Sequence, residues 1–128
     1  MPTRVWSHIS DYAAFIRGTS IIIRDFNQLF LPEVPAVYPV FYVISKWKGA
    51  FNEQYTYAVR LTSPSASVIL TTPVEQAKIT GGPNGTEHVS VTQLIQTTFP
   101  VFGEYKIRLL INGSTVHSMP LHLFPDVR

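Results

Sequence analysis

The chain contains no cysteine among its 128 residues. This absence excludes disulfide frameworks, zinc sites built on thiolates and cysteine nucleophiles. It also suits a reducing compartment, where thiols are kept reduced and disulfides are rare. We therefore expect neither a disulfide-stabilised fold nor thiol chemistry.

Charged residues and long hydrophobic runs are also scarce. Only 14% of the residues are charged whereas 45% are apolar, so we expect a folded chain whose surface polarity comes largely from Ser, Thr, Asn and Gln. The longest apolar run, Ala36 to Ile44, is interrupted by Pro39 and falls far short of the roughly 20 residues that span a bilayer. Residues 1–18 contain no apolar segment long enough for a signal peptide. These features predict a cytoplasmic protein without a membrane segment.

Motifs that indicate catalysis are missing as well. There is no G-x-S-x-G motif. The spacing of Asp11, Asp25 and Asp126 from histidines and other carboxylates does not indicate a catalytic triad or a carboxylate dyad. The glycine-rich stretch from Gly81 to Gly85 contains Pro83, which lacks an amide, and no Lys-Ser or Lys-Thr follows it. This stretch is therefore interpreted as a flexible turn, and we expect no enzymatic activity.

The four histidines do not predict a metal site. His117 and His122 are five residues apart on one expected strand, which places their side chains on opposite faces. His8 and His88 lie on other expected strands, so only the fold could bring them near each other. We therefore expect no bound metal and no cofactor.

A β-hairpin over residues 99–124 is the clearest structural signal. Polar and apolar residues alternate up to Asn112-Gly113, a dipeptide typical of tight hairpin turns, and a second run of strand-forming residues follows. A two-residue turn would place Leu109 opposite Val116. A three-residue turn with a glycine bulge would place Leu109 opposite Thr115 and align His117, Met119, Leu121 and Leu123 with the face of Tyr105. We favour the second register because it gathers more apolar side chains on one face.

The remaining sequence also predicts short strands separated by turns. Pro and Gly are frequent and spread along the chain, and no internal repeat is visible. The segments 10–16 and 26–39 are interpreted as a bend and a long connection, and 72–85 as irregular with a conceivable helical turn over 73–77. The other expected strands cover residues 4–9, 19–24, 40–48, 54–61, 66–71 and 86–98. We expect one domain over residues 1–128, an all-β antiparallel sandwich of about 7–8 strands with an immunoglobulin-like arrangement.

Two local features of this sandwich have alternative interpretations. Tyr105 enters the penultimate strand after a proline-containing turn, which fits either a tyrosine corner or an ordinary inward-facing aromatic residue. The alternation in residues 86–98 loses phase near Gln93 to Ile95, which fits either a β-bulge or a strand that crosses between sheets.

Several short motifs along the chain resemble those of a family of small, uncharacterised prokaryotic β-sandwich proteins, a bacterial domain of unknown function. They extend over nearly the whole chain: Ser10-Asp11-Tyr12-Ala13, Gly18, Pro32-x-x-Pro35, Phe99-Pro100-x-x-Gly103-x-Tyr105 and Asn112-Gly113. The resemblance implies an immunoglobulin-like sandwich in the cytoplasm with no assigned function. It carries over no functional residue, and residues 72–85 have no counterpart in the family pattern.

One stretch combines aromatic and basic residues in a way that suggests a binding surface. Its members are Lys46, Trp47, Lys48, Phe51 and Arg60. Such residues around one loop could stack on bases or hold a peptide. The alternative interpretation makes Trp47 an inward-facing residue flanked by solvated lysines. It is favoured because the net charge is only +2 and no basic stripe is visible.

These observations favour a non-enzymatic interaction module that acts through loops or an edge strand. Its expected partner is a protein, either a different one or a second copy of this chain. The low charge of the surface leaves few lysines to block edge pairing, which favours a homo-oligomer. An alternative function is weak binding of single-stranded nucleic acid or a small ligand through the loop Lys46 to Phe51, although the scattered charge disfavours nucleic acid. A pocket lined by tyrosines would instead indicate a small-ligand or carbohydrate binder.

Overall fold

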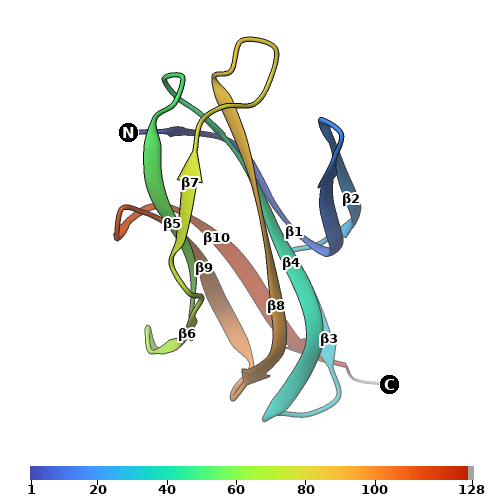
Figure 1. Ribbon diagram of the computed structural model, residues 1–128. Coiled ribbons are helices and arrows are strands. Elements are labelled where there is room, and N and C mark those ends of the chain that lie inside the picture. The colour runs from blue at the N-terminus through green and yellow to red at the C-terminus, as the bar shows by residue number, and fades with distance from the viewer. Residues whose placement is uncertain (127–128) are drawn as a thin grey trace.

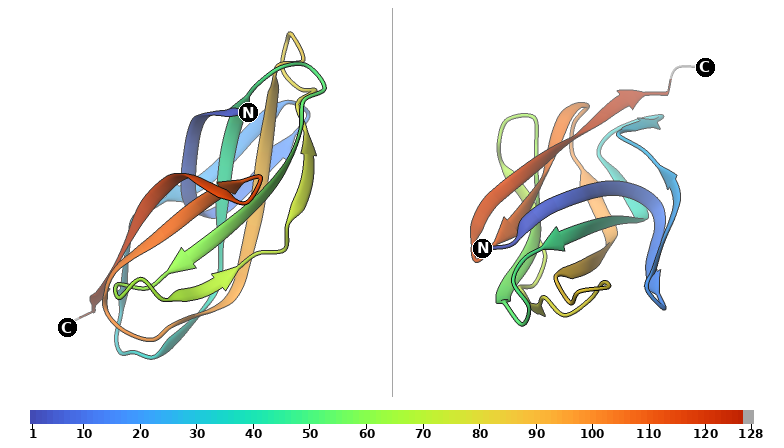
Figure 2. Two further views of the ribbon diagram at one scale, coloured as in Figure 1. Left: turned by 90° about the vertical axis from the view of Figure 1, so that its left-hand side faces the viewer. Right: turned by 90° about the horizontal axis from the view of Figure 1, so that it is seen from above.

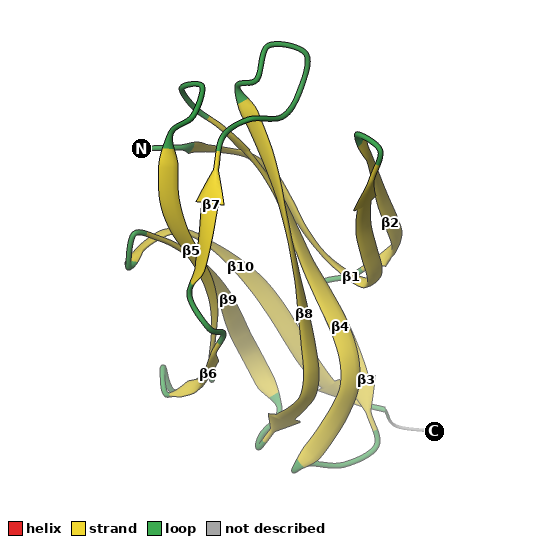
Figure 3. Cartoon of the chain, viewed as in Figure 1, coloured by secondary structure: helices red, strands yellow, loops and turns green. Residues whose placement is uncertain are grey.

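The protein is an all-β chain in which ten strands and no helix are found among the described residues, 1–126 (Figures 1 and 3). In this computed structural model the all-β fold class predicted from the sequence is confirmed, whereas the described residues form ten strands and not the expected 7–8. The strands are β1 (Thr3–Ile16), β2 (Thr19–Asp25), β3 (Gln28–Leu31), β4 (Ala36–Lys48), β5 (Gln54–Thr62), β6 (Val68–Thr71), β7 (Glu75–Lys78), β8 (Glu87–Phe99), β9 (Gly103–Ile111) and β10 (Ser114–Pro125).

The strands form two sheets. The four-stranded sheet has the order β2-β1-β4-β8, and the six-stranded sheet has the order β3-β10-β9-β5-β6, with β7 paired to β5 as well. All pairings are antiparallel except that of β3 with β10, which is parallel. Figure 2 shows the two layers from the side and from above.

The hydrophobic core lies between the two sheets. Strand alternation sends Tyr57 and Leu61 of β5 inward, where they meet Phe41 and Trp47 of β4 from the opposite sheet. Burying a large apolar side chain of this kind stabilises a fold by about 1.5–3 kcal/mol. Because the core draws on both sheets, the arrangement is sandwich-like, whereas the immunoglobulin-like label stays a prediction.

The predicted bend at residues 10–16 is wrong, because β1 is a single strand of 14 residues. Its first part pairs with β4 as far as Ser10, and its second part pairs with β2. The turn residues Arg17 and Gly18 both have positive φ, 51° and 79°, which is typical of a two-residue hairpin turn. The cross-strand apolar pairs that β2 offers therefore keep the second part extended.

Two further segments are more extended than the sequence predicts. The proline-rich connection 26–39 contains β3 and the start of β4, and Pro39 is tolerated because β4 pairs with β1 only from Tyr42 onward. A helical turn over 73–77 is also wrong. There β7 adds a short edge strand to Gln54–Tyr57 instead, so that the backbone groups of β7 are paired.

The C-terminal hairpin differs from the favoured register. Ile111 lies opposite Ser114, so Asn112 and Gly113 form a two-residue turn, with positive φ of 51° and 82°. The register then shifts between Thr115 and His117, which places His117 opposite Leu109. Both predicted partners of Leu109 are therefore wrong. The bulge still brings Met119, Leu121 and Leu123 onto the buried face of Tyr105, as the favoured register predicted.

Tyr105 forms a tyrosine corner, one of the two interpretations that its position in the sequence allows. Its hydroxyl donates to the carbonyl oxygen of Val101 at 2.7 Å and accepts from the Val101 amide at 3.2 Å. Its buried ring packs edge-on against Phe99, with the ring centroids 5.0 Å apart. The hydroxyl therefore satisfies the backbone of the turn that leads into β9.

The predicted phase slip lies at Gln96, which has a positive φ of 52°. Thr92 and Leu94 face the core before it, and Thr97 and Phe99 face the core after it. Since β8 stays paired with β4 on both sides of Gln96, the slip is a local irregularity and not a crossing between sheets.

Candidate functional site

Trp47 is not available to a ligand. Its side chain is 0% exposed and lies in the core, where its ring packs edge-on against Tyr57 with a centroid distance of 5.7 Å. Lys46 and Lys48 alternate with it along β4 and point to the other face of the four-stranded sheet. The inward-facing interpretation of Trp47 is therefore confirmed, and the base-stacking interpretation loses its central residue.

The other members of the predicted surface are dispersed. The Lys46 Nζ pairs with the Glu87 Oε1 at 3.3 Å on the four-stranded sheet. Phe51 is 63% exposed at the turn after β4 and lies close to Gly85, where an added Cβ would approach its ring to 2.8 Å. Arg60 belongs to β5 of the six-stranded sheet. The structure therefore does not bring these residues together into one site.

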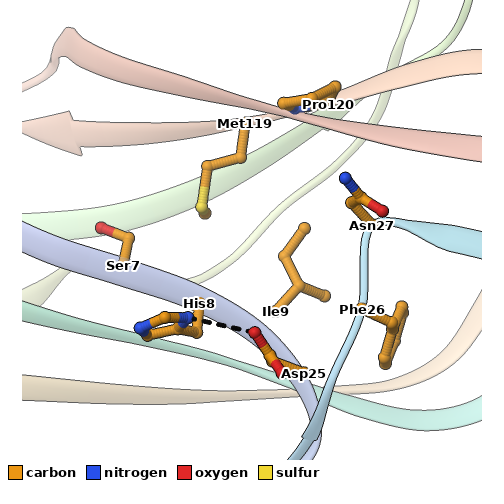
Figure 4. Close-up of a pocket in the computed structure, with 8 residues that line it drawn as sticks. All are labelled: Ser7, His8, Ile9, Asp25, Phe26, Asn27, Met119 and Pro120. Atoms are coloured by element: carbon orange, nitrogen blue, oxygen red, sulfur yellow. Dashed lines mark ion pairs between the residues drawn. The ribbon is translucent and has the colours of Figure 1, made fainter.

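A pocket of about 330 Å³ opens between β1 and β10 (Figure 4). The His8 Nδ1 and the Asp25 Oδ2 lie 3.6 Å apart at this pocket, because the β1–β2 ladder places Asp25 opposite Ser10. No sequence spacing revealed this pair, since only the hairpin brings it together. The lining residues are Ser7, His8, Ile9, Asp25, Phe26, Asn27, Met119 and Pro120.

This pocket lacks the geometry of a nucleophilic site. Ser7 and His8 are consecutive in an extended strand, so their side chains leave the ribbon in opposite directions, as Figure 4 shows. The Ser7 hydroxyl is buried without a hydrogen-bond partner, so His8 does not activate it. Among residues 1–126, no group of three or more His, Asp or Glu side chains could hold a metal ion.

A cluster of neutral polar side chains lies inside the sandwich next to β8. Burial raises the pKa of both Tyr55 and Tyr57 to about 12, and the Tyr57 hydroxyl lies 3.5 Å from that of Ser45. Burial also lowers the pKa of His88, whose ring lies 6.1 Å from the ring of Tyr55. These groups stay neutral near pH 7. Since both tyrosines are buried, they do not line an open ligand pocket.

The free edge of β8 is the most distinctive surface feature. β8 ends the four-stranded sheet and pairs with β4 on one side. Among the described residues, its other side carries one backbone bridge, between Glu87 at the start of β8 and Gly81. The segment from His88 to Ile95 contains no Lys, Arg, Asp, Glu, Pro or Gly. It therefore lacks the charges and breaks that normally prevent an edge strand from pairing with another chain.

The other sheet edges are each protected. β3, β6 and β7 are only four residues long. The seven-residue β2 ends in the charged residues Arg24 and Asp25, so its uncharged run, Thr19 to Ile23, is shorter than that of β8. The part of β10 that extends beyond β3 contains a bulge at Val116 and Pro120. Short edges, charges, bulges and prolines all disfavour strand addition, so β8 stands apart from the other edges.

The side chains of β8 between His88 and Ile95 are uncharged on both faces of the sheet. Gln93 and Ile95 point away from the core, and Ile95 is 62% exposed while the Gln93 side chain donates to the Tyr42 hydroxyl at 3.0 Å. Ser90, Thr92 and Leu94 point into the core and are buried. A strand placed against β8 between His88 and Ile95 would therefore meet uncharged side chains of β8.

Comparisons with known proteins add a family but no activity. The sequence profile described as "Family of unknown function (DUF6941)" matches residues 5–124, as the motifs along the chain predicted. No curated protein matches the chain. Within residues 1–126, no helix has the length and apolar character needed to cross a bilayer.

The solved structures that match include the alkylpurine DNA glycosylase AlkC of Pseudomonas fluorescens, bound to DNA containing an abasic site analog. The identity is 9% and the TM-score 0.48, over 92% of this chain. The chain spans only 30% of that protein, and at this level of similarity the match carries no functional argument.

Proposed function

The chain belongs to DUF6941, a family of unknown function, and we propose that it is a non-enzymatic interaction module that self-associates through β8. The observation that carries the proposal is the uncharged, unbroken edge from His88 to Ile95. An exposed edge strand presents unpaired N–H and C=O groups to solvent, and a second strand satisfies them by extending the sheet.

A second copy of the chain suits this edge in sequence and charge. In an antiparallel twofold pairing centred on Thr92, Val91 lies opposite Gln93 and Val89 lies opposite Ile95. The outward-facing positions then form cross-strand pairs of apolar and neutral residues, which stabilise a sheet. No charged side chain of the segment meets its own copy, so the pairing joins two four-stranded sheets without repulsion.

Light scattering across a wide range of protein concentrations tests the proposal. The wild-type chain is expected to reach twice the mass of one chain as concentration rises. The double substitution Gln93→Lys and Ile95→Lys places four lysines across the twofold axis, so it is expected to raise the concentration for half-dimerisation at least tenfold.

A matched double substitution on the other sheet controls for added charge. Val68→Lys and Gln76→Lys replace exposed residues of β6 and β7, and this variant is expected to dimerise as the wild type does. Far-UV circular dichroism confirms that both variants fold. A wild-type chain that stays monomeric at every concentration, or a β8 variant that dimerises normally, would rule out the proposed interface.

A further inference from the structure

The outer face of the six-stranded sheet is predominantly positive. Four cationic side chains lie on outward-facing positions of β5, β7 and β9, namely Arg60, Lys78, Lys106 and Arg108. Among residues 1–126, none of the four forms an ion pair. Glu104 is the one carboxylate on the outward-facing positions of these three strands, so this face is complementary to an anionic partner.

Two of these cations lie directly opposite each other. Arg60 on β5 is the cross-strand partner of Arg108 on β9. Each guanidinium donates only to a neutral hydroxyl: the Arg60 Nε to Thr71 at 3.1 Å, and the Arg108 Nη1 to Ser118 at 3.2 Å. Like charges placed directly opposite destabilise a sheet, and an anionic group bound between them removes that repulsion.

The same face continues into a row of exposed rings. Phe30 of β3 is 57% exposed and stacks on Phe124 of β10, which is 38% exposed, with their centroids 5.5 Å apart. Phe124 also stacks on His122 at 5.9 Å, with the ring planes 8° apart. Open aromatic faces of this kind are the platforms on which unpaired bases stack.

The β9–β10 ladder fixes how the rings and cations are spaced. Ser118 pairs with Arg108, Pro120 with Lys106, and His122 with Glu104. Each step of two residues advances about 6.8 Å, so the face from the Arg108 row to Phe124 is about 20 Å long. This length suits a short stretch of extended single strand. The cationic end of the face would contact its phosphates, and the aromatic end would stack on its bases.

From this arrangement we propose that the outer face of the six-stranded sheet binds single-stranded nucleic acid. Arg60, Lys106 and Arg108 hold phosphates, while Phe30 and Phe124 stack on bases. A duplex is disfavoured because its bases are already stacked on each other and unavailable to the rings. This face belongs to a different sheet from the β8 edge, so this proposal is independent of self-association.

Fluorescence anisotropy of a labelled 12-nucleotide oligothymidine, titrated with the full chain at about 50 mM salt, tests the proposal. Arg60→Gln with Arg108→Gln is expected to weaken binding at least tenfold and to reduce the slope of log K against log salt by about 1.4, or 0.7 for each cation. Phe30→Ala with Phe124→Ala is expected to weaken binding about tenfold or more while leaving the salt slope unchanged.

The matched control removes two exposed cations elsewhere, with Arg17→Gln and Lys48→Gln, and is expected to bind as the wild type does. Absence of binding at low salt, equal loss in the control, or tighter binding to the duplex would overturn the proposal. Binding of poly-glutamate with equal affinity, unaffected by the aromatic substitutions, would identify an acidic peptide surface instead. Light scattering on the same variants, with dimer mass retained, separates this outcome from failure of the β8 interface.

Discussion

Trp47→Ala is expected to lower the free energy of unfolding by about 3–5 kcal/mol, the range for removing a large aromatic side chain from a packed core. The side chain is fully buried between the sheets and packs on Tyr57, so its removal leaves a cavity that neighbouring strands cannot close without losing their pairing. Urea denaturation measures the change, with unfolding monitored by far-UV circular dichroism because the substitution removes a tryptophan fluorophore.

The flanking lysines provide the matched control. Lys46→Ala removes an ion pair with Glu87 whose side chains are 28% and 27% exposed, and Lys48→Ala removes an exposed cation, so each is expected to change stability by less than about 1 kcal/mol. If Trp47→Ala were as mild as the lysine substitutions, Trp47 would have to be a surface residue, and the two-sheet core described above would be incorrect.

Ionisation of two buried tyrosines, Tyr55 and Tyr57, is expected to destabilise the fold by about 4 kcal/mol at pH 12, on the order of 2 kcal/mol from each. The pKa of Tyr55 and of Tyr57 is raised from 10 to about 12 because burial disfavours the phenolate. Since the folded-state pKa lies above the unfolded one, the stabilisation is fully present below pH 10. It is lost progressively as pH rises from 10 through 12.

Urea midpoints measured at pH 8, 10, 11 and 12 follow this loss. The double variant Tyr55→Phe and Tyr57→Phe has no phenol at either position, so its stability is expected to fall less between pH 10 and pH 12. A variant that loses stability as steeply as the wild type would show that other groups cause the alkaline transition.

The C-terminal hairpin shows how far local sequence patterns determine the fold. Asn112-Gly113 and the alternation before it predict the two strands and their turn, because both signals depend on residues close in sequence. The bulge at Val116 is set by which register buries Met119 and Leu121 against the opposite sheet. That depends on tertiary packing, so the position of Leu109 was predicted wrongly.

The candidate sites were less predictable because they depend on how strands are ordered. Sequence alone placed Arg60 with the loop after β4, whereas the sheet order places it beside Arg108, 48 positions further along the chain. The His8–Asp25 pair and the ring stack of Phe30 on Phe124 likewise join strands that only the topology brings together. The strand pattern predicted β8 itself, but no pattern within one strand shows that it lies at an edge.

Amide hydrogen exchange at low and high protein concentration tests most directly whether β8 is an open edge that pairs with a second copy. The amides of β8 between His88 and Ile95 are expected to become slower to exchange as the dimer forms. Those of β3, β6 and β7 are expected to exchange at the same rate at both concentrations. Protection in β8 that does not change with concentration, or protection that appears at another edge instead, would contradict the account.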